Sequence, residues 1–193
     1  MTPTTTLPDL RPALAQSQAW VAELIAGVRP DQWDAPTPCT DWTVRDLVGH
    51  LFAVQSRIEA NPAGSVNHLP STLPVPDADA DAAFRTAAER GAAAWSDEAL
   101  ASTVVRPYGE VPGAVAVADF TREHLVHGWD LATATGQDPE ALGDLAATIL
   151  PSARQFLPAE MRGAGIPFDP VVEPATDAGP TEQLANWLGR RSR

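Results

Sequence analysis

The stretch FTREHLVHGWDLATATGQ, residues 120–137, places four polar or ionisable side chains within eight residues of an otherwise apolar segment. They are Glu123, His124, His127 and Asp130. On a helical wheel, apolar residues cover nearly the whole surface and His127 lies near the middle of one face, which predicts that residues 111–135 form the most buried helix. An ionised glutamate in such a helix is costly unless it is paired or bound to a cation.

Glu123 and His124 precede His127 by four and three residues, so both neighbour it on one helix surface. A histidine and a carboxylate at this spacing, joined by a histidine from a facing helix, supply three ligands for a divalent ion. His50, at the rim of the apolar stripe of a helix expected to start at Thr43, is the candidate third ligand. The same residues also fit a hydrogen-bonded structural pair. Spacing alone does not decide between these interpretations, or between Glu123 and His124 as the partner of His127.

Hydrophobic periodicity and capping residues predict an all-α chain with long connecting loops. Thr43 and Asp46 form a short capping box at the start of the second helix, and Gly136 suits the C-terminal cap of the fourth. A short extended piece around residues 103–106 is the weakest local signal, and the prediction does not include it. The helices are expected at residues 9–27, 43–60, 77–100, 111–135, 139–161 and 181–193, with Pro151 bending or dividing the fifth.

The chain of 193 residues has no internal repeat, which favours a single domain over residues 1–193, with a body at 1–160 and a C-terminal tail at 161–193. A net charge of −12 argues against nucleic acid or an anionic membrane as a partner. The chain begins without the pattern of a signal peptide and contains no apolar run of membrane-spanning length, so a cytoplasmic location is expected. The single Cys39 excludes an internal disulfide and fits a reducing compartment.

Two motifs carry a resemblance to a known family. They are PTPCTDWTVRDLVGHL at residues 36–51 and EHLVHGWDLATATGQ at residues 123–137. Together they resemble the mycothiol-dependent maleylpyruvate isomerase-like group of the DinB/YfiT superfamily, and in particular its short actinobacterial members. The resemblance runs from Trp33 to Gly136 and, more loosely, to the ending LANWLGR. It implies a DinB-like four-helix bundle with one divalent metal at one end, whose ligands fall here on His50, Glu123 and His127.

Other residues near these motifs have two interpretations each. Asp130, about one turn from His127, is a candidate acceptor for the second ring N–H of that histidine, as metal-bound imidazoles require. The alternative is a local pair with Arg45 or Arg122. His124 is a candidate donor to the ligand residues, although a hydrogen-bonded core histidine is the more common outcome.

The expected pocket over the metal has three candidate lining residues. Arg106 and Tyr108 lie in the loop before the buried helix, and Trp42 lies in the loop before the second helix, where it could instead anchor that loop. Cys39 is expected to pack near the start of the second helix rather than to bind the metal, because His50 lies about 10 Å further along the helix axis. His68, in a Pro-rich loop, is expected to be solvated.

Three functional hypotheses follow, all with a small-molecule partner and a monomeric or homodimeric protein. The first is a metal-dependent enzyme in which zinc, or nickel, iron or manganese, activates a small thiol for S-transfer to, or isomerisation of, an electrophile. Mycothiol as that thiol is implied by the resemblance alone. The isomerase carries an additional C-terminal domain with an active-site arginine, and fewer than forty residues follow the fifth helix here, so maleylpyruvate itself is not the expected substrate.

The second hypothesis is a non-catalytic ligand-binding or regulatory bundle. The third is a metal-dependent hydrolase with Asp130 as general base.

Overall fold

The computed structural model describes residues 8–64, 66, 68–162 and 168–191. This part of the chain is mostly helical and contains one antiparallel pair of strands. The helices are α1 (Arg11–Ala26), α2 (Val44–Ala60), α3 (Ala80–Ala94), α4 (Asp97–Ala101), α5 (Gly113–Thr135), α6 (Gly143–Phe156) and α7 (Pro180–Trp187). The strands are β1 (Thr103–Arg106) and β2 (Gly109–Pro112), and three short 3-10 turns lie at Pro30–Gln32, Asn61–Ala63 and Ala159–Met161.

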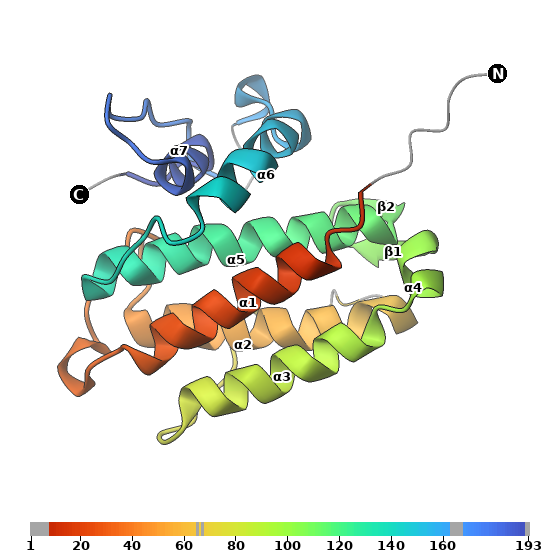
Figure 1. The fold of residues 1–193 in the computed structure, drawn as a ribbon, viewed down its shortest axis with the longest axis horizontal. Coiled ribbons are helices and arrows are strands. Elements are labelled where there is room, and N and C mark those ends of the chain that lie inside the picture. Colours follow the sequence, from red (N-terminus) through yellow and green to blue (C-terminus); the bar gives the residue numbers. More distant parts are fainter. Residues whose placement is uncertain (1–7, 65, 67, 163–167, 192–193) are drawn as a thin grey trace.

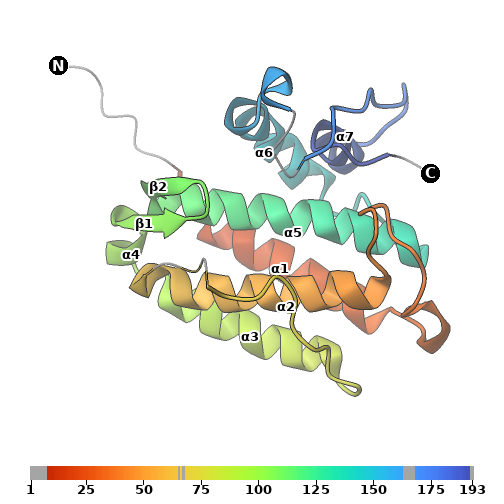
Figure 2. The ribbon, with the colours of Figure 1, turned by 180° about the vertical axis from the view of Figure 1, so that it is seen from behind.

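The helices α1, α2, α3 and α5 lie side by side (Figure 1). Helix α5 packs between α1 and α2, and α3 packs against the other sides of both. The chain runs in one direction along α1 and α5 and in the opposite direction along α2 and α3 (Figures 1 and 2). Helices α6 and α7 pack on each other and cover the outer side of α5 (Figure 1). Within the described residues, no helix combines the length and apolarity needed to cross a membrane.

Helix α5 is buried along most of its length, as its nearly all-round apolar sequence predicts. Phe120 and Leu131 are fully buried on one side of it, and Leu125 is fully buried on another. Because both α1 and α2 need apolar contacts with α5, a helix with only one apolar stripe could not occupy this place. Residues 120–137 therefore determine the arrangement of the helices around them.

The predicted helix boundaries are confirmed at several ends. The Thr43 hydroxyl accepts a hydrogen bond from the Asp46 N–H at 3.2 Å, and the Asp46 carboxylate accepts one from the Thr43 N–H at 3.0 Å, which completes the capping box. Gly136 ends α5 with a left-handed backbone at φ 72°. In the described part of the Pro-rich segment at residues 61–76, no helix follows the short 3-10 turn at its start.

Three predictions about the chain elements need correction. The single helix expected at residues 77–100 is two helices, because the buried Trp95 donates its ring N–H to Ile58 O at 2.9 Å and Ser96 caps α4.

The helix expected from residue 139 starts at Gly143, because the Glu140 carboxylate instead accepts hydrogen bonds from the first backbone N–H groups of α7. That helix ends at Phe156 and continues through Pro151 as one element. The all-α class also needs amendment, since Val104 pairs with Val111 in the β1–β2 ladder.

Two glycines beside the candidate histidines let other segments approach closely. Gly49 has no side chain where the backbone of Leu73 crosses α2, and the Leu73 N–H donates to Gly49 O at 2.9 Å. Gly128 faces the ring of Trp20 on α1, and a methyl group there would overlap the ring. The small residues therefore set how near the loop at 61–79 lies to α2, and α1 to α5.

Gly128→Ala should lower the free energy of unfolding by about 1–3 kcal/mol, because the added methyl forces α1 away from α5. The measurement is chemical denaturation monitored by circular dichroism. Gly143→Ala is the matched control, since its new methyl would meet its nearest neighbour at 3.4 Å, an ordinary contact, and should change the free energy of unfolding by less than about 1 kcal/mol. Equal stability of the wild type and Gly128→Ala would contradict this account of the α1–α5 contact.

Candidate functional site

His50 on α2 meets Glu123 and His127 on α5 where the two helices pack together. Their potential ligand atoms all lie within 4.8 Å of one another. The His50 Nε2 atom is 3.4 Å from Glu123 Oε1, and the two imidazole rings have centroids 4.8 Å apart at 71°. The histidine side chains are about one-tenth exposed and that of Glu123 is 30% exposed, so this cluster has one accessible side.

The orientation of the His50 ring is set by a backbone carbonyl. Its Nδ1–H donates to Ser71 O at 2.8 Å, because a carbonyl oxygen can only accept. The opposite nitrogen, Nε2, is buried and has no hydrogen-bond partner among the described residues. In the neutral ring, Nε2 carries no proton, and its lone pair faces a carboxylate oxygen of Glu123. That arrangement is unfavourable unless a proton or a cation lies between the two atoms.

The His127 ring is oriented by Asp130, which is fully buried. The His127 Nδ1 lies 3.1 Å from Asp130 Oδ2, and Arg190 Nε donates to both Asp130 oxygens at 3.2 and 3.3 Å. With the proton held at Nδ1, the Nε2 atom of His127 carries a free lone pair. Burial lowers the pKa of His127 and outweighs the opposing hydrogen bond from Asp130, so the ring is neutral at pH 7. The partner of Asp130 is thus Arg190 rather than Arg45 or Arg122.

The carboxyl group of Glu123 is ionised in this setting. Burial raises its pKa, but electrostatic interaction with His50, and then with His127 and Arg106, outweighs burial and holds the pKa well below its usual range. The cluster therefore combines one negative charge with two imidazole lone pairs. Such a donor set fits a divalent cation.

His124 has a different environment from its two neighbours in the motif. It is fully buried, its Nδ1–H donates to Phe120 O at 2.7 Å, and its Nε2 accepts from the Gln55 amide at 2.7 Å. The Gln55 oxygen in turn accepts from Gln18 at 2.8 Å, so one hydrogen-bonded chain joins α1, α2 and α5. Burial lowers the pKa of His124 to about 4. These bonds give His124 a role in helix packing.

A cavity of about 260 Å³ lies against the cluster. The predicted pocket residues Arg106 and Tyr108 line it together with Glu123 and His127. Trp42 takes a different place, with its ring 4.7 Å from the His50 ring and 6.0 Å from that of His127. It covers the histidines on the side of the loop before α2 and also packs against the hydrophobic core.

Asp119 organises the part of the cavity wall that lies one turn before Glu123 on α5. Its carboxylate accepts hydrogen bonds from Arg106 Nη2 at 2.7 Å, from the Tyr108 hydroxyl at 2.7 Å and from the guanidinium of Arg122. Arg106 and Tyr108 sit at the β1–β2 turn, so the small sheet serves to bring these two side chains to α5. One buried carboxylate thereby fixes two arginines and a tyrosine.

Two residues of the site, Asp119 and Arg190, have no place in the sequence-based prediction, and Arg122 enters it only as a candidate partner of Asp130. Asp119 and Arg122 are three residues apart on α5, and helical spacing could have paired them. Arg190 lies 60 residues after Asp130 in the chain, so no local pattern indicates the contact. His68 is exposed, as predicted for a residue of that loop.

Cys39 lies closer to the metal-ligand candidates than the sequence predicts from the length of α2 between Thr43 and His50. Its Sγ is 3.5 Å from Arg190 Nη2, and Cys39, His127 and Asp130 form a second group of possible ligands. The guanidinium of Arg190 already supplies the positive charge between Cys39 and Asp130. Burial raises the pKa of the Cys39 thiol to about 11, which keeps it protonated at neutral pH.

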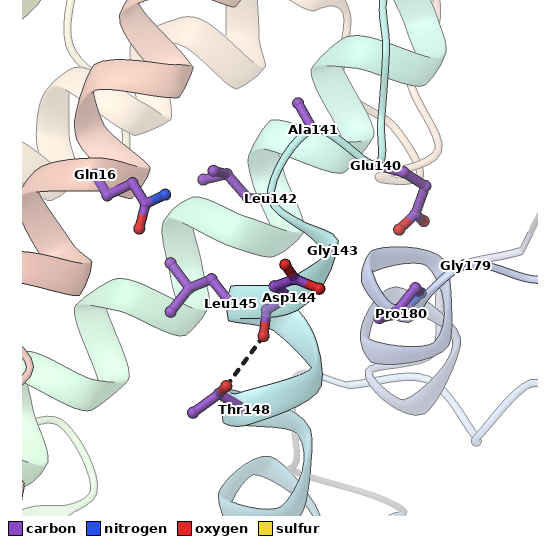
Figure 3. Close-up of a pocket in the computed structure, with 10 residues that line it drawn as sticks. All are labelled: Gln16, Glu140, Ala141, Leu142, Gly143, Asp144, Leu145, Thr148, Gly179 and Pro180. Carbon is purple, nitrogen blue, oxygen red and sulfur yellow. Dashed lines mark hydrogen bonds between the residues drawn. The ribbon is translucent and has the colours of Figure 1, made fainter.

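A larger cavity of about 550 Å³ lies between α1 and the starts of α6 and α7 (Figure 3). Gln16, Glu140, Asp144 and Thr148 are among its lining residues. Thr148 donates to the backbone of Asp144 at 3.0 Å, and Glu140 is occupied by the backbone of α7. Because no described histidine or cysteine lines this cavity, the chemistry of the protein is better placed at the smaller one.

The family described as Mycothiol maleylpyruvate isomerase N-terminal domain matches residues 14–132 of the chain. This match spans α1 to most of α5 and includes all three residues of the cluster. The chain belongs to this family. The family expected from the two sequence motifs is thereby confirmed.

Individual relatives extend the comparison beyond the family match. Two proteins named as uncharacterized from Mycobacterium tuberculosis, MT0763 and Rv0738, are each 35% identical over 184 residues, covering 92% of this chain and 96% of the relative. A crystal structure of the mycothiol-dependent maleylpyruvate isomerase is 22% identical, with a TM-score of 0.49 over 78% of this chain and 72% of that chain.

Cys39 should react slowly with iodoacetamide in the native protein. A rise in the thiol pKa from 9.0 to about 11 lowers the thiolate fraction at pH 8 about a hundredfold, and the thiolate is the reactive form. Alkylation followed by mass spectrometry should therefore be about a hundredfold faster in denaturant than in buffer. A small-peptide thiol alkylated under both conditions corrects for the solvent. Equal native and denatured rates would refute the burial of this thiol.

Proposed function

We propose that His50, Glu123 and His127 bind one divalent metal ion. The observation that carries this proposal is the buried Nε2 of His50, which has no partner in the described part of the chain and faces the ionised Glu123 at 3.4 Å. A metal ion accepts both lone pairs and removes their mutual repulsion. Ser71 O and Asp130 support this role because each holds a proton at the Nδ1 of one histidine and leaves its Nε2 free to coordinate.

Two histidines and a glutamate suit zinc, and nickel, iron or manganese fit the same atoms. The four packed helices and a cluster formed between α2 and α5 support a DinB-like four-helix bundle as the architecture. In this interpretation the chain is a single domain, and its C-terminal tail contributes Leu188 and Arg190 to the cavity. A cytoplasmic protein with a small-molecule partner is the setting that such a site and the net charge of −12 favour.

The activity we propose is thiol-dependent S-transfer to, or isomerisation of, a small electrophilic molecule. A bound metal ion would supply an open coordination position that lowers the pKa of a thiol, and mycothiol is the thiol that membership of the family supports. The chain itself contributes the orientation of both histidines, the charge of Glu123 and the arginine-lined wall of the cavity. Apolar side chains around that cavity exclude water from the reacting groups.

The alternative hypotheses receive less support from the geometry. A hydrolase needs a general base within reach, but both oxygens of Asp130 accept from Arg190 and one also lies on His127. Asp130 is also fully buried. A closed, coordinatively filled site would favour a non-catalytic ligand-binding or regulatory bundle, whereas here a cavity adjoins both Glu123 and His127.

Metal content tests the proposal directly. Plasma mass spectrometry on untagged protein should find about one equivalent of zinc or another divalent metal in the wild type, and its loss in His127→Ala, because three ligands are reduced to two. His68→Ala is the matched control, since this histidine is exposed in a loop and should leave the metal content unchanged. Circular dichroism verifies that each variant is folded.

A wild type that remains metal-free after incubation with zinc, nickel, iron and manganese would refute the metal site. Retention of the metal by His127→Ala at the wild-type level would refute the ligand assignment. With metal-loaded protein, calorimetric titration with mycothiol then tests the thiol. Equal heats in the wild type and in metal-free Glu123→Gln would exclude binding of the thiol at this site.

A further inference from the structure

Arg106 is a buried cation with donors that nothing in the described structure satisfies. Its side chain is 6% exposed, and Nη2 donates to Asp119 at 2.7 Å. Its Nε and Nη1 atoms are buried without a hydrogen-bond partner among the described residues. Leaving such donors unpaired is costly, more so on a charged group, and natural proteins rarely do so without a functional reason.

The aromatic contacts of Arg106 do not satisfy these donors. The guanidinium carbon lies 4.1 Å from the centroid of the Phe120 ring and 5.9 Å from that of Tyr108. A cation–π contact uses the face of the guanidinium, whereas the N–H groups point outward in its plane. The ring of Phe120 therefore supports the cation and leaves its in-plane donors available.

Apart from Arg190, the cavity is lined by two arginines and two carboxylates, so its charges balance, but the hydrogen-bond donors of Arg106 are not all satisfied by the described residues. Arg106 and Arg122 share the single carboxylate of Asp119, and both line the cavity next to Glu123. Arg190, at the same cavity, is already occupied by Asp130. An oxyanion that reaches Arg106 would supply the missing hydrogen-bond acceptor. Guanidinium groups recognise carboxylates in this way because their N–H groups form a planar fork.

The rest of the cavity is apolar. Val126, Phe156, Phe168 and Leu188 line it, and the Tyr108 ring packs on Phe156 with centroids 5.1 Å apart. The volume of about 260 Å³ is below the range of about 300–1,000 Å³ that holds drug-sized ligands. The cavity thus suits a small molecule with an apolar body and a terminal anionic group.

We propose that Arg106 is the carboxylate-binding residue of this cavity, and that the molecule bound there is a small carboxylate with an apolar or aromatic body. Asp119 and Tyr108 position the guanidinium, and Arg122 adds its charge to the same wall. The inference rests on the proposed function only in taking this cavity as the substrate side of the metal cluster. The binding itself depends on Arg106 and needs no metal.

Benzoate and benzamide are matched probes, because they share their shape and differ in charge. Isothermal titration of the full chain should show benzoate binding at least about tenfold more tightly than benzamide. Arg106→Gln should remove this preference and weaken benzoate binding by about 10- to 100-fold, the range for a lost hydrogen bond to a charged group. Arg90→Gln is the control, since Arg90 is exposed and pairs with Glu59 away from the cavity.

The same titrations on metal-free wild type and on Glu123→Gln separate this inference from the metal proposal. Arg106-dependent binding of benzoate to metal-free protein supports the inference even if no metal site exists. Binding that vanishes with the metal but is unchanged in Arg106→Gln would place the carboxylate on the ion and overturn the inference. Equal affinity of the wild type for both probes, or no benzoate binding at millimolar concentration, also overturns it, and neither result depends on the folding of a variant.

Discussion

The ionised carboxylate of Glu123 in the interface between α2 and α5 is the constraint to which the surrounding structure responds. A buried charge of this kind destabilises a helical core unless positive groups or a cation face it. The groups nearest to it are the rings of His50 from α2 and His127 from the next turn of α5, with the cation of Arg106 at the end of β1. The packing of α2 on α5 is therefore also the assembly of the site, and any change in that packing alters both.

Close packing beside the two histidines depends on a neighbouring glycine in each case. Gly49 precedes His50 and admits the backbone at Leu73, so the same loop can present Ser71 O to the ring of His50. Gly128 follows His127 and admits α1, which holds α5 from the opposite side. The dipeptides GH and HG in the two motifs thus each combine a chemical group with the space that fixes its position.

Local signals in the sequence are sufficient for much of this structure. The capping box at Thr43, the left-handed Gly136 and the apolar surface of residues 111–135 each depend on neighbours within a few residues, and helix boundaries follow from them. The break at Trp95 and the delayed start of α6 depend on partners from other segments, namely Ile58 O and the first turn of α7. Periodicity contains no information on such partners, so those predictions failed.

The site also combines features that local sequence signals indicate with features that depend on distant segments. His50, Glu123 and His127 are indicated by motif and spacing, but the contacts that orient them are not local. Three acidic residues occur on α5, and two of them, Asp119 and Asp130, are each neutralised by arginines, one of which comes from the end of the described chain. Glu123 alone has no arginine in direct contact within the described residues, and it faces two imidazole nitrogens that carry lone pairs. Asp119 and Asp130 are paired with arginines, whereas Glu123 is not paired with any described arginine. The negative charge of Glu123 therefore remains available to a cation from solution.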